Sequence, residues 1–275
     1  MRKIGFTLAL IIFLALLSAC AHTTPTAVTG TTAATLDAIV QKGELAVGTA
    51  GSMPPFNMTT KDGEIIGFEP DLARLIAAAL GVPLKLAPMP FSELLPALET
   101  GKIDMILSNM TMTPQRNLKV AFVGPYFLSG KAFLTKEKTI ANAKSTTEIN
   151  SPDTRLVALK GSTSQFFVEK LLSKTQLTTS ASYDEAVKMV IDDKVHALVA
   201  DYPICIVSAL RYPDAGLLSL ITPLTYEPIG IALPGHDPLL INWLENFLGS
   251  LEGSGRIEQL EARWFENADW INKLP

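Results

Sequence analysis

The sequence predicts an α/β fold with largely parallel sheets, and two observations carry that prediction. Short apolar runs, typical of buried strands, alternate along the chain with patterns typical of amphipathic helices. The helical patterns are bounded by residues that start and stop helices. Because strands and helices alternate, successive strands are expected to lie parallel with helices packed on the sheets. The expected strands are residues 45–49, 105–108, 156–159, 197–200 and 230–233.

Two helices are delimited by the sequence itself. The first opens at residues 69–71, Glu-Pro-Asp, and ends at Gly81, a residue suited to a left-handed helix terminus. Its apolar side chains share one face: Leu72, Leu75, Ile76 and Leu80. The second opens at residues 92–93, Ser-Glu, and ends at Gly101.

Residues 104–116 lead from a strand into a cluster of polar side chains. Thr113 followed by Pro114 predicts a helix N-cap and the first helical residue, so Arg116 falls in the first turn. The helix dipole favours anions there, and a negative group is therefore expected beside Arg116. A bound carboxylate would serve, because guanidinium holds a carboxylate through two parallel hydrogen bonds. The alternative is a surface ion pair for Arg116, with ordinary capping by the hydroxyls.

Polar groups follow two further strands. Residues 162–165, Ser-Thr-Ser-Gln, open a helix after strand 156–159, which makes Thr163 and Ser164 part of an anion site or, alternatively, part of an N-cap alone. Asp201 ends strand 197–200, and ligands of open α/β sheets collect at such strand ends.

These groups together complement the head group of an α-amino acid. Arg116 and the turn at Thr163 would hold the carboxylate, while Asp201 and the hydroxyl of Thr111 would hold the ammonium. Ser108 and Asn109 add further acceptors for an ammonium group.

The N-terminal segment predicts export. Two basic residues precede an apolar run at 4–17, which is too short for a comfortable membrane span and typical of a signal-peptide core. Leu-Ser-Ala-Cys at 17–20 resembles a bacterial lipobox, so a signal peptide at 1–19 and lipidation of Cys20 are expected; the alternative is a plain secretory signal. Residues 20–34 are small and polar, as in a flexible tether. The folded part is therefore expected in the periplasm or at the cell surface, anchored to a membrane by the lipid.

Composition excludes several classes of function. The formal net charge is -4 and no basic run occurs, so nucleic acid is not an expected partner. Once Cys20 carries lipid, Cys205 alone remains, and no intramolecular disulfide is expected. The three histidines, His22, His196 and His236, show neither metal-ligand spacing nor pairing with a nucleophile. No metal and no cofactor is expected.

A family resemblance rests on motifs spread over nearly everything after the tether. The motifs are residues 36–45, 47–56, 67–72, 95–104, 112–116 and 161–163, together with Asp201. The chain resembles the amino-acid-binding, family 3 extracellular solute-binding proteins that feed ABC importers. The resemblance implies a two-lobe, periplasmic-binding-protein-like (type II) fold, with a mostly parallel sheet in each lobe and two hinge crossings. The implied lobes are residues 35–130 with 227–275, and residues 131–226.

The resemblance implies that the protein binds a free amino acid between its lobes and delivers it to an ABC importer permease. It also implies a monomer that is not an enzyme. The implied head-group positions are Arg116, Thr111, Asn109, Thr163 and Asp201. Closure of the lobes would trap the ligand.

Side-chain specificity is read from other positions. Met53 and Phe91 fall where the resemblance implies two walls around the ligand side chain, and Phe56 is interpreted as a core residue. Where binders of basic amino acids carry an acid in the first loop, this chain has Ala50 and then Gly51. A cationic side chain would lack a partner there, so a neutral or polar amino acid is expected.

Two alternatives remain open. The fold also resembles that of cyclohexadienyl dehydratases, which act on prephenate or arogenate and need a general acid in the cleft. Glu227, near the second hinge crossing, is the candidate, and a solvated hinge glutamate is the competing interpretation. A ligand-sensing lipoprotein that signals instead of delivering cargo is the other alternative.

Overall fold

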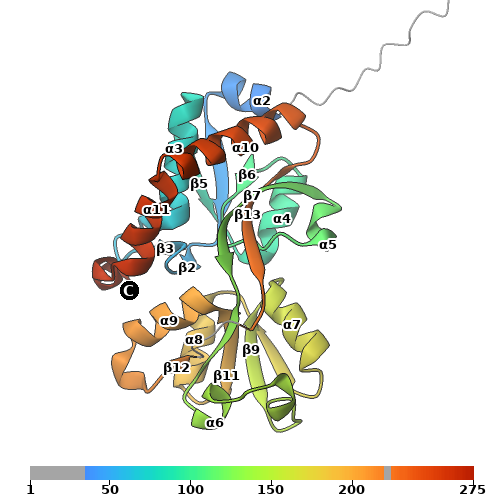
Figure 1. The fold of residues 1–275 in the computed structure, drawn as a ribbon, viewed down its shortest axis with the longest axis vertical. Coiled ribbons are helices and arrows are strands. Elements are labelled where there is room, and N and C mark those ends of the chain that lie inside the picture. The colour runs from blue at the N-terminus through green and yellow to red at the C-terminus, as the bar shows by residue number, and fades with distance from the viewer. Residues whose placement is uncertain (1–34, 220–223) are drawn as a thin grey trace, which may run out of the picture. The chain divides into compact units, whose positions relative to one another are not determined.

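The structure, a computed structural model, describes residues 35–219 and 224–275. The expected signal peptide, the lipidated Cys20 and the tether of residues 20–34 lie outside the described residues. Within the described part, no helix combines the length and the apolar character needed to cross a bilayer. Two five-stranded sheets, each flanked by helices, give the fold two lobes (Figure 1).

The first lobe is built on a sheet with strand order β5-β1-β6-β13-β7. Its strands are β1 (Leu45–Thr49), β5 (Leu84–Pro88), β6 (Met105–Ile106), β7 (Val120–Ser129) and β13 (Glu227–Pro234). Its helices are α2 (Thr35–Lys42), α3 (Phe68–Leu80), α4 (Phe91–Glu99), α5 (Pro114–Asn117), α10 (Pro238–Gly253) and α11 (Arg256–Glu261), followed by the π-helical turn η4 (Ala262–Glu266) and the 3₁₀ turn η5 (Asp269–Lys273). A small sheet of β2 (Ser52–Met53), β3 (Asn57–Thr59) and β4 (Ile65–Ile66) completes it.

The second lobe has a sheet with strand order β10-β9-β11-β8-β12. Its strands are β8 (Lys131–Thr135), β9 (Arg155–Leu159), β10 (Gln176–Ser180), β11 (Ala197–Asp201) and β12 (Leu218–Ser219). Its helices are α6 (Lys138–Ala141), α7 (Thr163–Leu171), α8 (Tyr183–Ile191) and α9 (Tyr202–Arg211), with 3₁₀ turns η2 (Thr146–Glu148) and η3 (Pro213–Ala215).

Each sheet combines the expected parallel pairing with antiparallel pairing. In the first sheet β1 is parallel to β5 and β6, whereas β13 is antiparallel to β6 and β7. In the second sheet β9 is parallel to β10 and β11, whereas β8 is antiparallel to β11 and β12. The antiparallel strands in both sheets include those next to the crossings between lobes, because the chain there enters or leaves a lobe directly and not through a helix.

The crossings are short and extended. Only Gly130 separates β7 of the first sheet from β8 of the second. The returning strand β13 begins at Glu227, which is paired with Ser129 at the end of β7. The two crossing segments therefore run side by side and antiparallel (Figure 1). The residue limits given above for the lobes stay a prediction.

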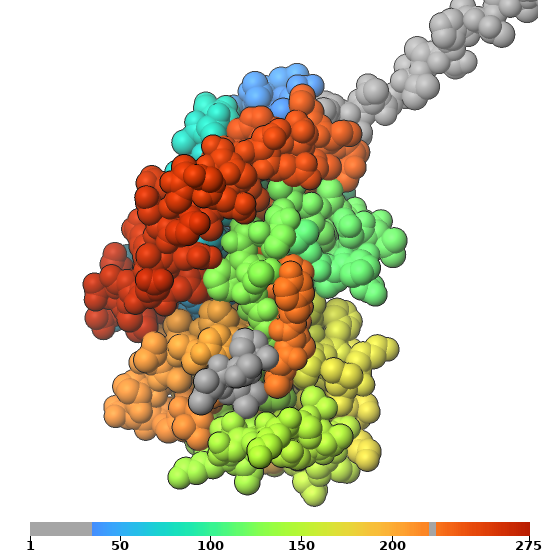
Figure 2. All heavy atoms as spheres, viewed as in Figure 1, coloured from blue at the N-terminus to red at the C-terminus, as the bar shows by residue number. Residues whose placement is uncertain are grey.

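The helix boundaries follow the signals in the sequence. Gly81 caps α3 in the left-handed conformation, and its N–H donates to the carbonyl of Ala78. On the predicted apolar face of α3, Leu72 and Ile76 are fully buried against the core of the first lobe. Figure 2 shows α10 and α11 (red) spread over one face of that lobe. Some cleft residues described below follow β6 and β9 or end β11, whereas Lys131 and Glu227 begin β8 and β13.

Candidate functional site

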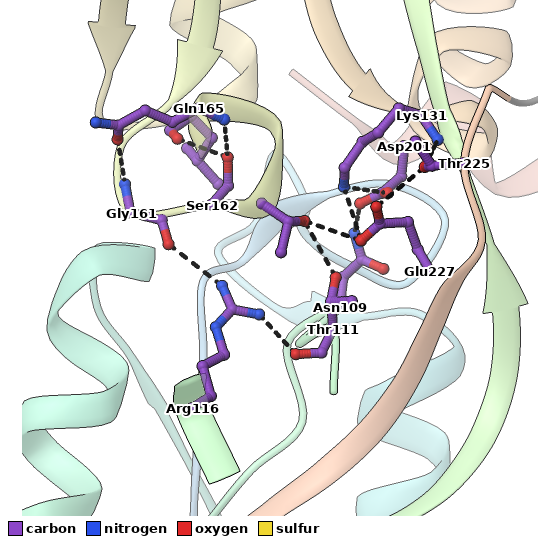
Figure 3. A network of polar contacts seen from close by, with 12 residues as sticks. Asn109, Thr111, Arg116, Lys131, Gly161, Ser162, Gln165, Asp201, Thr225 and Glu227 are labelled. Carbon is purple, nitrogen blue, oxygen red and sulfur yellow. Dashed lines mark hydrogen bonds and ion pairs between the residues drawn. The ribbon is translucent and has the colours of Figure 1, made fainter. Parts of the chain in front are cut away.

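Arg116 reaches the cleft because Thr113 and Pro114 start helix α5 as predicted. The Thr113 side chain accepts a hydrogen bond from the N–H of Arg116, and Pro114 is the first helical residue. The guanidinium donates to the carbonyl oxygen of Thr111 at 2.7 Å and to that of Gly161, in the other lobe, at 3.2 Å. Arg116 is therefore a buried cation that binds both lobes (Figure 3).

The charge of Arg116 has no ionic partner within the described residues. Its hydrogen bonds go to neutral carbonyls, and the ion pairs found in the described part of the chain do not include it. Burial lowers its pKa to about 10, while the carboxylates of Glu227 and Asp201 act in the opposite direction. The side chain is therefore charged at neutral pH, and its guanidinium carbon lies 5.6 Å from the centre of the Phe91 ring.

A chain of hydroxyls leads from Thr111 to Glu227. Thr163 donates to the Oε2 of Glu227 at 3.0 Å, and the Thr111 hydroxyl lies 3.2 Å from that of Thr163. Since the single proton of Thr163 is used on Glu227, Thr111 is the donor in the bond between the two threonines. Thr225 donates to the other oxygen of Glu227 at 3.0 Å.

Asp201 lies at the centre of a second group of contacts. Its Oδ2 accepts from the side-chain amide of Asn109 at 2.5 Å, across the two lobes. Its Oδ1 lies 2.8 Å from the ammonium of Lys131, which is also 3.5 Å from the Oε2 of Glu227. We call Lys131, Asp201 and Glu227 the Asp201 cluster; all three are buried (Figure 3).

Two neighbours of the cluster contribute no charge. Burial raises the pKa of the Tyr183 hydroxyl well above its usual value, and Asp201 acts in the same direction. Burial likewise raises the pKa of the Cys205 thiol. The cleft thus holds a single positive charge at Arg116 and, with both acids ionised, a net charge of minus one in the Asp201 cluster.

Glu69 holds the backbone of the site residue Asn109. Its carboxylate accepts from the backbone N–H of Asn109 at 2.5 Å, from the side chain of Asn57 at 2.5 Å, and from the hydroxyl of Tyr126. Asn109 has a positive φ of 47°, a conformation that asparagine tolerates better than most residues. Burial raises the pKa of Glu69 to about 7, although the three hydrogen bonds act in the opposite direction. Glu69 therefore fixes the backbone from which Asn109 reaches Asp201.

The remaining predicted site residues, Phe91, Met53 and Ser164, are all buried, but they lie in different places. Phe91 is buried beside Arg116. Met53 is 1% exposed, and its sulfur accepts a hydrogen bond from Ser108 at 3.8 Å. Ser164 is fully buried beside Tyr183 and within the second lobe, while its neighbour Thr163 reaches the cleft. The roles of these residues as ligand contacts stay predictions.

Two interpretations of aromatic and acidic residues are settled by burial. Phe56 is a core residue as predicted, because it is fully buried and packs against the rings of Phe127 and Phe265. The centre of its ring lies 5.1 Å from the centre of each of those two rings. The interpretation of Glu227 as a solvated hinge glutamate is wrong with respect to solvation. Glu227 lies at the start of β13, is 8% exposed, and accepts hydrogen bonds from Thr163 and Thr225.

Sequence reasoning missed Lys131 and Glu69. Lys131 precedes an apolar strand, and its charge gives no sign that the side chain folds inward. Glu69 lies in the segment that opens helix α3, where the helix dipole alone explains an acid. The only usable signal for Lys131 was its place directly after Gly130 at the lobe crossing.

A cavity of about 750 Å³ borders the Arg116 end of the cleft. Phe91, Arg116 and Thr163 line it together with residues of α4 and α7. Among the described residues, no group of histidine, cysteine, aspartate and glutamate side chains is arranged to hold a metal ion.

The comparison with protein families decides the affiliation. Residues 45–267 match the model of the bacterial extracellular solute-binding proteins, family 3. The chain belongs to this family. This solute-binding protein is therefore an extracytoplasmic protein by its family, and the two-lobe fold predicted from the sequence is confirmed.

Relatives of this solute-binding protein include both binders and an enzyme. It is 26% identical to an arginine-binding periplasmic protein of Mannheimia haemolytica over 216 residues, which cover 78% of this chain and 87% of the relative. It is 23% identical to a cyclohexadienyl dehydratase of Pseudomonas aeruginosa, with 84% of this chain and 86% of the relative covered. Among solved structures, a binding component of an ABC transporter from Wolinella succinogenes, complexed with lysine, is similar at a TM-score of 0.80 and 37% identity, covering 84% of this chain and 100% of that one.

Proposed function

We propose that this protein binds a free amino acid in the cleft between its lobes and delivers it to an ABC-type importer. The observation that carries the proposal is the separation of charge in the cleft. Arg116, a buried cation with no ionic partner in the described part of the chain, lies at one end, and the net negative Asp201 cluster lies at the other. A zwitterion places its carboxylate and its ammonium against these two ends.

Hydrogen-bonding groups between the two ends support the same ligand. Thr111, Thr163 and Asn109 lie between Arg116 and Asp201; Asn109 and Thr111 come from the loop after β6, and Thr163 is the first residue of α7. The arginine-binding and lysine-bound relatives are consistent with recognition of what all amino acids share. Phe91 and Met53 would then contact the ligand side chain.

For the side chain of the ligand we propose a neutral or polar group. The first loop has Ala50 and Gly51, and the hydrogen bonds there join backbone N–H groups to Ser108 and Asn57. No carboxylate of this loop is available to pair with a cationic side chain. Burying such a cation without a partner is costly.

The test is a panel of the twenty amino acids, first by thermal shift and then by calorimetry on the purified protein. A ligand that binds only the native state raises the melting temperature. We expect a shift with at least one neutral or polar amino acid and weaker binding of arginine, lysine and histidine. If none of the twenty shifts the melting temperature, amino-acid binding is refuted. If arginine binds more tightly than glutamine and the small neutral amino acids, the neutral preference alone is refuted.

The dehydratase alternative has one supporting observation, the buried Glu227 in the cleft, and one relative with that activity. A general acid must carry a proton to donate. Thr163 and Thr225 donate to the two oxygens of Glu227, and the ammonium of Lys131 lies 3.5 Å away, so in this arrangement both oxygens act as acceptors. We therefore propose that the protein is a binder and not an enzyme. Formation of an aromatic product from prephenate or arogenate, followed by absorbance, would overturn this.

Membrane attachment belongs to the same proposal. Cys20 would carry the lipid, palmitate included, that anchors the protein at a membrane facing the periplasm or the cell surface, where a monomer delivers ligand to the permease. Intact mass of the mature N-terminus tests the anchor. A mature chain that begins at a residue other than a lipidated Cys20 would contradict it.

A further inference from the structure

Lys131 is the most unusual charged residue of the cleft. It is the first residue of β8, directly after the lobe crossing, and is 1% exposed. Its ammonium lies 2.8 Å from Asp201 and 3.5 Å from Glu227. A buried ammonium needs such partners, because removal from water without them is strongly unfavourable. The lysine is thus held in place by the same two acids that form the negative end of the cleft.

The charges in the cleft show what Lys131 does to ligand selection. Asp201 and Glu227 together carry two negative charges, and Lys131 neutralises one of them. Tyr183 and Cys205 stay neutral, because burial raises the pKa of each. One negative charge therefore remains for a ligand that brings one ammonium. Without Lys131 two would remain, which matches a ligand with an ammonium and a cationic side chain.

We propose that Lys131 is a specificity-determining residue that selects against amino acids with cationic side chains by supplying the second positive charge of the cleft from the protein itself. The proposal rests on the amino-acid-binding function proposed above and adds the residue that sets the ligand class. It is independent of the first loop, because Lys131 lies in the other lobe. The ammonium of Lys131 and a cationic ligand side chain would repel each other strongly, because the low dielectric inside a cleft screens charges less than water does.

The test compares the purified mature protein with its Lys131→Met variant, which keeps the length of the side chain and removes the charge. Calorimetry gives the dissociation constants for glutamine, alanine, lysine and arginine. We expect the preference for glutamine over arginine to fall by about tenfold or more in the variant, from the loss of charge repulsion in the cleft. An unchanged ratio in a folded variant overturns the proposal.

Three further variants make the result specific. Lys131→Arg retains the charge, and we expect it to keep the preference for glutamine over arginine. Lys136→Met removes a lysine of the same lobe that pairs with Asp193 outside the cleft, and it should leave the ratio unchanged. Lys131→Met combined with Glu227→Gln restores the net charge of the cluster, and it should restore the ratio. A double variant that retains the altered ratio contradicts the charge argument.

Folding and function are kept apart in the readout. Circular dichroism establishes whether Lys131→Met folds; if it does not, Lys131→Gln, which keeps a hydrogen-bond donor near Asp201, is measured in its place with the same expected change. Wild-type protein that binds none of the twenty amino acids of the panel refutes the proposed function. Wild-type protein that prefers glutamine, with an unaltered ratio in the charge-removing variant, refutes only the role of Lys131.

Discussion

Arg116, Lys131 and Glu69 are buried ionisable side chains, and each is held in a different way. Lys131 is paired with acids, and Glu69 accepts hydrogen bonds from three donors. Arg116 donates to neutral carbonyls alone among the described contacts. Of the three, it is the one without an ionic partner among the described residues, which is what the proposed pairing with a ligand carboxylate requires.

Replacing Arg116 therefore tests the carboxylate end of the site. Arg116→Ala should weaken amino-acid binding on the order of a hundredfold or more, because it leaves a buried ligand carboxylate unpaired. Calorimetry with the best ligand of the panel measures the loss. Lys85→Ala, which removes an exposed cation paired with Glu44 in the same lobe, is the control and should bind normally. Affinity of the Arg116 variant within threefold of wild type would remove this residue from the site.

Glu69 makes stability depend on pH. Its pKa is raised from 4.5 to about 7 in the folded protein, mainly by burial. The folded state then binds more protons than the unfolded state between these two values, so stability falls as pH rises through that window, by on the order of 3 kcal/mol, and levels off above pH 7. Tyr126, a titratable group that contacts Glu69 directly, has a pKa well above this range.

Urea unfolding from pH 4.5 to 8 measures that slope. We expect the Glu69→Gln variant to show a smaller decline than wild type over this range, whatever its absolute stability. Glu261→Gln is a comparison variant, because Glu261 also has a raised pKa but is only partly buried. Parallel curves for wild type and Glu69→Gln would show that Glu69 does not titrate in the window.

Helices and strands were predictable where the hydrophobic pattern agreed with the residues that start and end such elements. All five expected strands exist, and α3 and α4 begin and end within two residues of their signals. Strands such as β7 and β10 were missed. β7 contains Gly124 and Pro125 within an otherwise apolar run, and β10 is mostly polar, with exposed residues. The Asp201 cluster was half predicted: Asp201 follows a recognisable strand end, whereas nothing local shows that Lys131 is buried.

The start of helix α3 depends on Gly67. Its φ is 136°, and an added Cβ would lie 2.3 Å from the backbone oxygen of Phe56. Gly67→Ala should therefore destabilise the fold by more than the roughly 1 kcal/mol expected for a positive φ alone. Gly63→Ala is the matched control, because Gly63 has φ +82° and nothing within 4 Å of an added Cβ. Equal losses of unfolding free energy for the two variants would contradict a steric role of Gly67.

At the scale of the whole molecule, the lobes are joined by two crossing strands and by contacts across the cleft. The bond from Asn109 to Asp201, the bond from Arg116 to the Gly161 carbonyl, and the pair of threonine hydroxyls all link residues of different lobes. These contacts join the lobes and, in part, involve the groups proposed to bind ligand. If those groups bind ligand, ligand affinity and the contact between the lobes are expected to be coupled.

Asn109→Gly tests that coupling. Glycine accepts the positive φ of residue 109 and removes the side chain that donates to Asp201. We expect a larger radius of gyration without ligand in small-angle scattering, and ligand binding weakened by about tenfold or more, as for loss of a hydrogen bond to a charged group. Asp193→Gly, another non-glycine residue with positive φ, is the control and should change neither value. Unchanged scattering and affinity for the Asn109 variant would separate this contact from closure.

The hydroxyl chain from Thr111 through Thr163 to Glu227 has a direction, because each hydroxyl holds one proton. A ligand carboxylate that accepts the proton of Thr163 would take away one of the two hydroxyl donors of Glu227 and leave Thr225 as the other. The Oε2 of Glu227 would then be available to an incoming ammonium, so occupation of one end would prepare the other. A molecule that carries both charges would gain from this exchange, whereas a simple acid or a simple amine would not, and the orientation of two protons would then favour amino acids over their one-charge analogues.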